Sequence, residues 1–305
     1  MDKALVEMIT KLVTERLQQE HSDSKQPKAV HIPSSNEPFI ELFQQRKPSS
    51  TQAVNTPQKA QNAKVFTETF DDKFAHARSK TPARVGVGRT GPRPLTNTML
   101  KFRFDHAAAV DAVYGEVEQG LLEKLKLFTI DTKALDDKET YILRPDLGRK
   151  LTDEAKKTLL QKCEKHAQVQ IIVSNGLSAS AINANLENVL LSLQQSLASL
   201  NLKTGTPFYI EQGRVGLMDD IGELLQPEVV VYLIGERPGL VSAESMSAYL
   251  CYKPRKETIE SDRTVVSNIH KGGIPPAEAG AYLGNLIQKI LNYEASGVTL
   301  VQKEE

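Results

Sequence analysis

The sequence lacks a net charge. Its 305 residues carry 38 Lys and Arg against 38 Asp and Glu, so the formal charge at pH 7 is zero. A protein without a positive field does not gather phosphates over its surface, which argues against a nucleic-acid binder. We therefore expect no nucleic-acid partner.

Cysteine is almost absent. Cys163 and Cys251 are too few for a disulfide scaffold, and neither is part of a C-x-x-C pair. The six histidines never fall in H-E-x-x-H or in another ligand spacing. We expect no metal site made by this chain alone.

Long apolar runs are also missing. The longest, "VVVYLI", is far too short to span a bilayer, and the N-terminus has no signal-peptide pattern. These absences predict a soluble cytoplasmic protein without a membrane partner.

The first part of the chain has a composition of its own. Residues 1–20 place apolar side chains on one helical stripe (Leu5, Ile9, Leu12, Val13 and Leu17). This pattern predicts an amphipathic helix that acts in targeting or docking; the alternative is a helix that folds back onto its own domain or frays. Residues 21–80 are rich in Gln, Ser, Lys, Pro and Asn, which predicts a flexible, disordered linker.

The rest of the chain is organised. Residues 81–150 read as an arm and a helical part, with one long helical pattern over 99–125 that Gly115 divides and strand-like pieces over 126–131 and 140–145. Residues 151–305 read as an α/β domain. Expected helices (151–166, 178–202, 217–225 and 275–293) alternate with expected strands (169–174, 207–211, 228–235 and 248–252). Continuous apolar strands in this alternation predict an α/β fold with a Rossmann-like, mostly parallel sheet and helices on both faces.

One glycine motif resembles a dinucleotide fingerprint but lacks its context. Gly86, Gly88 and Gly91 satisfy G-x-G-x-x-G, which works between a strand and a helix. Only "ARV" separates Pro82 from the first glycine, and prolines follow the last one, so neither element fits. We interpret this segment as an extended arm.

Ligands of parallel α/β sheets bind beyond the carboxyl ends of the strands. "VSNGLSASAI" places polar side chains at such an end (Ser174, Asn175 and Ser178, beside Gly176), which suits a polar ligand or an ordinary capped turn. "YIEQGRVGLMDDIG" places a tight turn between Gly213 and Gly216 after the next strand. We interpret Asp219 and Asp220 there as helix-start charges.

The most apolar strand ends in a charged pair. In "VVVYLIGERPGL", Glu236 and Arg237 follow the strand directly, which indicates a binding role or a structural ion pair. The later stretch "SDRTVVSNIHKGGIPP" gathers further polar groups (Asp262, Arg263, Asn268 and His270). No serine elbow, Cys–His pair or P-loop accompanies them, so we assign no catalytic residue and favour a cofactor-contacting subunit.

Several of these segments resemble the small (light) subunit of ethanolamine ammonia-lyase. They are "VGVGRTGPRPLT", "RPDLGRKL", "VSNGLSASAI", "GRVGLMDDIGELL", "VVVYLIGERPGL" and "DRTVVSNIHKGGIPPAEA". The resemblance runs from about residue 81 to the C-terminus.

The resemblance implies a division of labour between two chains. A large subunit binds ethanolamine and carries the radical chemistry, and adenosylcobalamin lies between the subunits. The family's cofactor contacts match Val215, Glu236 and Val265; some relatives carry cysteine at the last position. The product pair is acetaldehyde and ammonia. The family setting also implies that residues 1–20 address the protein to a bacterial microcompartment, by contact with its shell or cargo.

Two alternatives stay open from the residues alone. The α/β pattern also fits a stand-alone nucleotide-binding enzyme that uses the same crevice. The N-terminal helix also fits an adaptor that is recruited to an assembly.

Overall fold

The computed structural model describes residues 74–81, 83–134, 137–239 and 241–305. All of them belong to one of the two compact units of the chain, Thr67–Glu305. The helix expected over residues 1–20, and the expected linker as far as residue 73, lie outside the described residues.

The last residues of the expected linker are helical. Helix α2 (Ala75–Lys80) forms where the sequence indicated the last residues of the linker, 21–80. The glycine motif follows it, in turns and in a small hairpin of β1 (Arg89–Thr90) and β2 (Arg93–Pro94). Gly86 and Gly91 have φ angles of 63° and 58°, which glycine adopts at little cost. The strand–turn–helix context of a dinucleotide fingerprint is absent here.

The long helical pattern is divided as the sequence predicts. Helix α3 (Thr96–Tyr114) ends at Gly115, whose N–H donates to Asp111 O at 2.8 Å, and α4 (Gln119–Lys124) follows. The strand expected over 140–145 is wrong, because Lys138–Leu143 form helix α5. Asp137 explains the difference: its carboxylate accepts a hydrogen bond from Thr140 N at 2.5 Å and caps this helix.

The α/β class is confirmed, but the sheet is mixed. Its order is β3 (Phe128–Asp131), β5 (Phe208–Glu211), β4 (Val169–Ser174), β6 (Val229–Gly235), β7 (Met246–Tyr252) and β8 (Thr264–Ile269). The first four strands are parallel to one another, whereas β7 pairs antiparallel with both β6 and β8. The expectation of a mostly parallel sheet therefore holds only over that first part. The connection 236–245 is short and its described residues form no helix, and a parallel crossover needs a longer connection.

Segments on the two sides of residue 150, where the sequence suggested a division, pair with each other. Strand β3 precedes it yet pairs with β5, and Thr132 bridges Leu151 across it. Strand β8 and the final helix α10 (Gly297–Glu304) are additions that the sequence patterns did not indicate.

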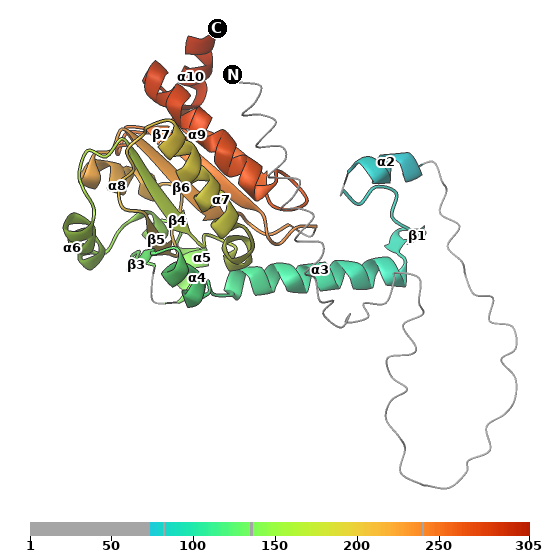
Figure 1. Ribbon diagram of the computed structural model, residues 1–305. Helices are drawn as coiled ribbons and strands as arrows, with labels where there is room; N and C mark the ends of the chain where they lie inside the picture. Colours follow the sequence, from blue (N-terminus) through green and yellow to red (C-terminus); the bar gives the residue numbers. More distant parts are fainter. Residues whose placement is uncertain (1–73, 82, 135–136, 240) are drawn as a thin grey trace, which may run out of the picture. The chain divides into compact units, whose positions relative to one another are not determined.

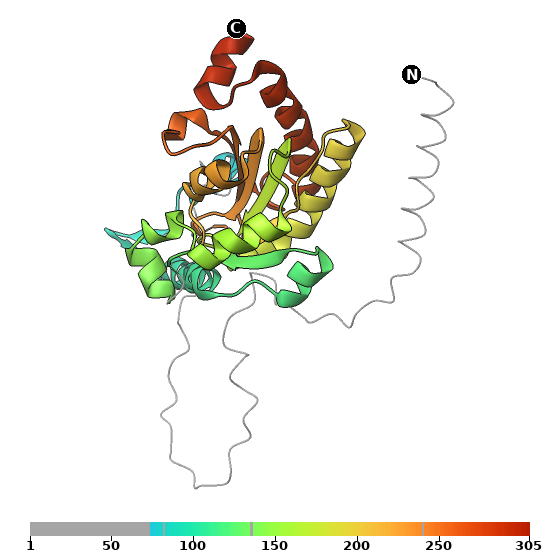
Figure 2. The ribbon, with the colours of Figure 1, turned by 90° about the vertical axis from the view of Figure 1, so that its left-hand side faces the viewer.

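Helices cover both faces of the sheet, as predicted (Figures 1 and 2). Helices α7 (Ala179–Ser199) and α9 (Pro276–Tyr293) pack on one face, and α6 (Asp153–Lys162) and α8 (Leu217–Leu225) on the other. Alternate side chains of β6 enter the two cores, Val231 on the α7 face and Tyr232 on the α8 face. Burial on both sides explains why this strand is continuously apolar.

No helix in the part of the chain that the structure describes is long and apolar enough to cross a membrane.

Candidate functional site

A cavity of about 470 Å³ opens at the carboxyl ends of β4, β5 and β6. The chain leaves β4 toward α7 on one face and leaves β5 toward α8 on the other, and such a divergence opens a crevice between neighbouring strands. The antiparallel strands β7 and β8 extend the wall. The lining residues are Tyr141, Gly176, Leu177, Arg214, Val215, Ile234, Gly235, Glu236, Arg237, Ser247, Tyr249, Val265 and Ser267.

The structure brings the three predicted contact residues together at this cavity. Val215 lies in the turn after β5, Glu236 directly follows β6, and Val265 lies on β8. Val265 is 45% exposed, so its side chain is free to contact a ligand or a second chain. Their role toward a cofactor stays a prediction.

Glu236 is held by neighbouring strands. Its Oε1 accepts hydrogen bonds from Ser247 Oγ at 2.5 Å and from Asn268 N at 2.9 Å. Burial raises the pKa of Glu236, but these hydrogen bonds to the charged form outweigh it and hold the pKa below its ordinary value. The carboxylate is therefore an ionised acceptor in the cavity wall. It forms no ion pair with Arg237 among the described residues.

The polar side chains expected at the end of β4 mostly bind the backbone. Ser174 Oγ accepts from Gly176 N at 3.2 Å and Gly213 N at 3.0 Å, which joins the turns after β4 and β5. Asn175 Oδ1 accepts from Gln212 N at 2.9 Å, and its Nδ2 donates to Glu211.

Ser178 has two backbone partners as well. It caps α7 by accepting from Ala181 N at 3.0 Å, and it donates to Ala243 O at 2.7 Å. The capped-turn interpretation of this segment is confirmed for these side chains, and from the four expected positions only Gly176 lines the cavity.

Two glycines let the strand ends pack closely. A Cβ on Gly235 would overlap the carbonyl oxygens of Asn175 and Ser178, and a Cβ on Gly176 would overlap Gly235 O. Gly176 also has a φ angle of 51°. The cavity floor at β4 and β6 thus depends on backbone packing.

Arg214 and Tyr141 form a stacked pair at the cavity. The Arg214 guanidinium carbon lies 4.1 Å from the centroid of the Tyr141 ring, and Arg214 Nη2 donates to Tyr141 O at 2.9 Å. The fully buried Tyr141 donates its hydroxyl to Gly213 O at 2.9 Å. Neither residue was predicted from the sequence to line the site. The position of Arg214 between two turn glycines was a usable signal; Tyr141 lay in a segment expected to be a strand.

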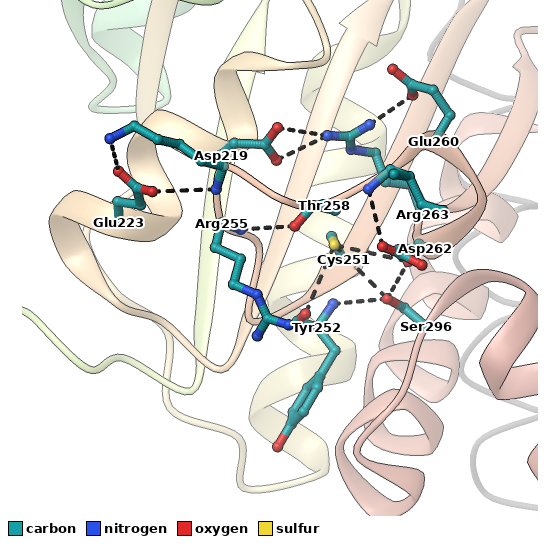
Figure 3. A network of polar contacts seen from close by, with 12 residues as sticks. Asp219, Glu223, Cys251, Tyr252, Arg255, Thr258, Glu260, Asp262, Arg263 and Ser296 are labelled. Carbon is teal, nitrogen blue, oxygen red and sulfur yellow. Dashed lines mark hydrogen bonds and ion pairs between the residues drawn. The ribbon is translucent and has the colours of Figure 1, made fainter.

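An ion-pair network joins α8 to Arg263, the residue directly before β8 (Figure 3). Arg263 Nη2 lies 2.9 Å from both carboxylate oxygens of Asp219, and Nη1 lies 2.7 Å from Glu260. The Arg263 side chain is only 2% exposed. Asp219 lies in the first turn of α8, which the turn with Val215 precedes, and Arg263 lies two residues before Val265 of β8. The network therefore joins segments that are close in sequence to both contact residues.

The expected roles of the two aspartates are extended by these contacts. Asp219 lies in the first turn of α8, as predicted, but it also pairs with Arg263. Asp220 accepts from Leu151 N at 3.1 Å. Both side chains connect α8 to other elements.

The far end of the network is polar and buried (Figure 3). Ser296 Oγ donates to Asp262 O at 2.5 Å and accepts from Tyr252 N at 2.9 Å, next to the Cys251 thiol. Burial raises the pKa of Cys251 to about 11.

The expected polar residue His270 forms hydrogen bonds within its own loop. It hydrogen-bonds to Asn268 at 2.8 Å and accepts from Gly272 N. In the described ranges, no three His, Cys, Asp or Glu side chains gather closely enough to hold a metal ion.

The family of this chain follows from its similarity to known protein families. A family model described as "Ethanolamine ammonia-lyase light chain (EutC)" matches residues 71–301. The chain belongs to this family. The resemblance seen in the sequence motifs is thereby confirmed over the arm, the sheet and its helices.

Curated relatives of the light-chain family agree with this assignment. The "Ethanolamine ammonia-lyase small subunit" of Fusobacterium nucleatum is 49% identical over 232 residues, which cover 76% of this chain and 78% of the relative. The protein of the same description from Clostridium tetani is 50% identical over 229 residues, 75% of this chain and 77% of the relative. That from Lachnoclostridium phytofermentans is 47% identical over 229 residues, with the same two shares.

Proposed function

We propose that this chain is the small subunit of an ethanolamine ammonia-lyase and forms one side of an adenosylcobalamin site. A large subunit provides the other side, binds ethanolamine and carries its conversion to acetaldehyde and ammonia. One observation supports this most directly: Val215, Glu236 and Val265, which come from three separate segments, line a single cavity.

The cavity suits part of a corrinoid. A corrinoid presents a broad apolar ring edge, carboxamides and a nucleotide tail with a phosphate. The cavity offers apolar Val215 and Val265, the ionised acceptor Glu236 and the donor Arg214. A volume of about 470 Å³ is that of a site for a drug-sized ligand, and cobalamin is larger. The remaining surface of the cofactor must then be covered by a second polypeptide.

The residues of this chain hold and shield the cofactor in this proposal. Glu236 accepts a hydrogen bond from an amide or hydroxyl of the corrinoid, while Val215 and Val265 pack against it and exclude water. When bound, adenosylcobalamin supplies the radical that begins the reaction. No side chain of this subunit is proposed to act on the substrate.

The test is reconstitution with the large subunit. Size-exclusion chromatography of both subunits with adenosylcobalamin should give corrinoid absorbance that co-elutes with both proteins, and ethanolamine should then be converted to acetaldehyde. The large subunit alone is the control and should show neither. Full activity without this chain would refute the proposal.

We further propose that residues 1–20, which lie outside the described residues, direct the cytoplasmic enzyme into a bacterial microcompartment. Deletion of residues 1–20 should move the protein out of the compartment and leave lyase activity unchanged. A fluorescent fusion measures the location, and an unchanged location would refute the targeting role.

The position of the cavity favours one other candidate. Stand-alone α/β enzymes bind nucleotides at the carboxyl ends of their strands, where this cavity lies. Thermal denaturation of the isolated chain with ATP, NAD⁺ or FMN separates the two functions. A stabilisation by one of these nucleotides in the absence of a large subunit would support that alternative.

A further inference from the structure

We propose that Arg214 binds an oxygen of the ligand, a phosphate oxygen or a carboxamide carbonyl, in the cavity at the ends of β4, β5 and β6. This inference rests on the proposed function for the identity of the ligand. Arg214 is then the positively charged binding group of the site, opposite in charge to Glu236.

The guanidinium lies where a ligand would reach it. Arg214 is half-buried and lines the cavity, in the turn that also carries Val215. Its backbone is fixed, since Arg214 N donates to Gly148 O at 2.9 Å. The ring of Tyr141 supports one face of the guanidinium, and Nη2 is used by Tyr141 O. These contacts orient the group before any ligand arrives, and a group that is already ordered loses little entropy on binding.

The charge of Arg214 is not compensated by the protein. Among the residues that the structure describes, no aspartate or glutamate forms an ion pair with it, and its only side-chain hydrogen bond goes to Tyr141 O. Its Nε is buried without a hydrogen-bond partner. Glu211, three residues away, is occupied by the hydroxyl of Tyr209 at 2.8 Å and by the amide of Asn175.

Arg263 provides an internal comparison. Its Nε is also buried without a partner, but its two terminal nitrogens pair with Asp219 and Glu260. A buried cation is ordinarily paired in this way, because an unpaired charge is costly to remove from water. The unpaired guanidinium beside a cavity is therefore explained best by a ligand oxygen that completes its environment.

The shared chemistry of the ligand group is an oxygen that accepts charge-assisted hydrogen bonds. A corrinoid offers two sources: the phosphate of the nucleotide tail and the carbonyls of the ring carboxamides. Cyanocobalamin carries both, whereas dicyanocobinamide has the carboxamides but no nucleotide tail. A comparison of the two therefore identifies the source.

The experiment measures corrinoid binding to the complex of this chain with the large subunit, by equilibrium dialysis and absorbance. Arg214→Lys keeps the charge but loses the stacked, forked geometry, and we expect about tenfold weaker binding of cyanocobalamin. Arg214→Met removes the charge and should weaken binding further. If dicyanocobinamide loses as much affinity, the carboxamides are the partners; if its affinity is unchanged, the phosphate is the partner.

Arg144→Met is the matched control. Arg144, the residue that follows α5, is exposed, pairs with Asp146 and lies outside the cavity. This variant should bind both corrinoids like the unmodified chain. Thermal denaturation of each variant checks the fold, and Arg214→Lys preserves the test if Arg214→Met fails to fold.

Two results would overturn the inference. Equal cyanocobalamin affinity of the unmodified chain and folded Arg214→Lys would show that Arg214 does not contact the ligand, while leaving the proposed function intact. If the unmodified complex bound no corrinoid, the proposed function would fail together with this inference.

Discussion

Two arginines of this protein, the buried Arg263 and the half-buried Arg214, lie in contrasting surroundings. Arg263 is buried and paired with Asp219 and Glu260. Arg214, at the cavity, stacks on Tyr141 and has no acidic partner among the described residues. Both guanidinium groups are oriented by the protein, but only the first has its charge balanced by the protein.

The contrast distinguishes residues that stabilise the fold from residues that are available to bind a ligand. The ion-pair network connects α8 to the start of β8, so its removal should mainly lower the free energy of unfolding. The cavity residues leave hydrogen-bonding capacity unused, so their substitution should mainly lower the affinity for the ligand. Each prediction below tests one side of this division.

The largest expected effect is on the network. Arg263→Met leaves Asp219 in a partly buried site without its cation, and we expect a loss of about 3–5 kcal/mol in the free energy of unfolding. Urea denaturation measures it. Arg214→Met is the counterpart and should cost about 1 kcal/mol or less, since it loses a stacking contact and one hydrogen bond. Equal losses in the two variants would remove the distinction.

A double variant sharpens the same point. Replacing both partners, in Arg263→Met with Asp219→Leu, removes the stranded carboxylate, and it should restore about 1–3 kcal/mol relative to Arg263→Met alone. Urea denaturation of both single variants and of the double variant completes the cycle. Strictly additive losses would show that the two side chains do not depend on each other.

A smaller effect is expected from the cavity floor. Gly235→Ala forces a Cβ against the carbonyl oxygens of Asn175 and Ser178, which we expect to cost about 1–3 kcal/mol and to weaken corrinoid binding. Gly239→Ala is the control, because its Cβ would meet only Ser242 O at an ordinary 3.7 Å. Denaturation and dialysis measure the two effects; if the two alanine variants behave alike, the close packing at β6 is unimportant.

Glu236 should give a small, pH-dependent effect. Its hydrogen bonds hold its pKa in the folded state below the ordinary 4.5, so its ionised form adds stability above that pH. This contribution is lost as the pH falls through the lowered folded value. Glu236→Gln should therefore show a weaker loss of stability on acidification than the unmodified chain. Denaturation between pH 3 and 7 measures the two curves; parallel curves would contradict the shifted pKa.

The smallest effect is expected at the thiols. Burial raises the pKa of both Cys163 and Cys251 to about 11, so neither forms much thiolate at neutral pH. A disulfide reagent should modify neither cysteine in the folded chain and both after denaturation. Rapid reaction of Cys251 in the folded state would indicate that the Ser296 end of the network opens.

Much of the fold was predictable because its signals are local. The strand over 169–174 and the helix over 217–225 follow from apolar runs and from acids in a first helical turn. Thr152 is a residue type that commonly caps helices, and its hydroxyl accepts from Ala155 N at 3.1 Å at the start of α6. Helix α5 was missed because its apolar residues 141–143 read as a strand, while its start depends on the single cap Asp137.

The candidate site was predictable in part. Glu236 stood out as a charge directly after the most apolar strand, and the family resemblance indicated Val215 and Val265. The other site residues could not be predicted, because they contact each other across long distances in the sequence. Tyr141 and Arg214 are far apart in sequence, and neither residue type reveals a stacked pair by itself.

By itself, the sequence determined most of the elements, their order and the family resemblance, because periodicity, caps and motif spacing act over a few residues. Only the tertiary structure decided the direction of β7 and β8 and the meeting of Val215, Glu236 and Val265 at one cavity. It also decided which arginine has an acidic partner. Such features depend on contacts between distant segments, and a linear pattern contains no distances between them.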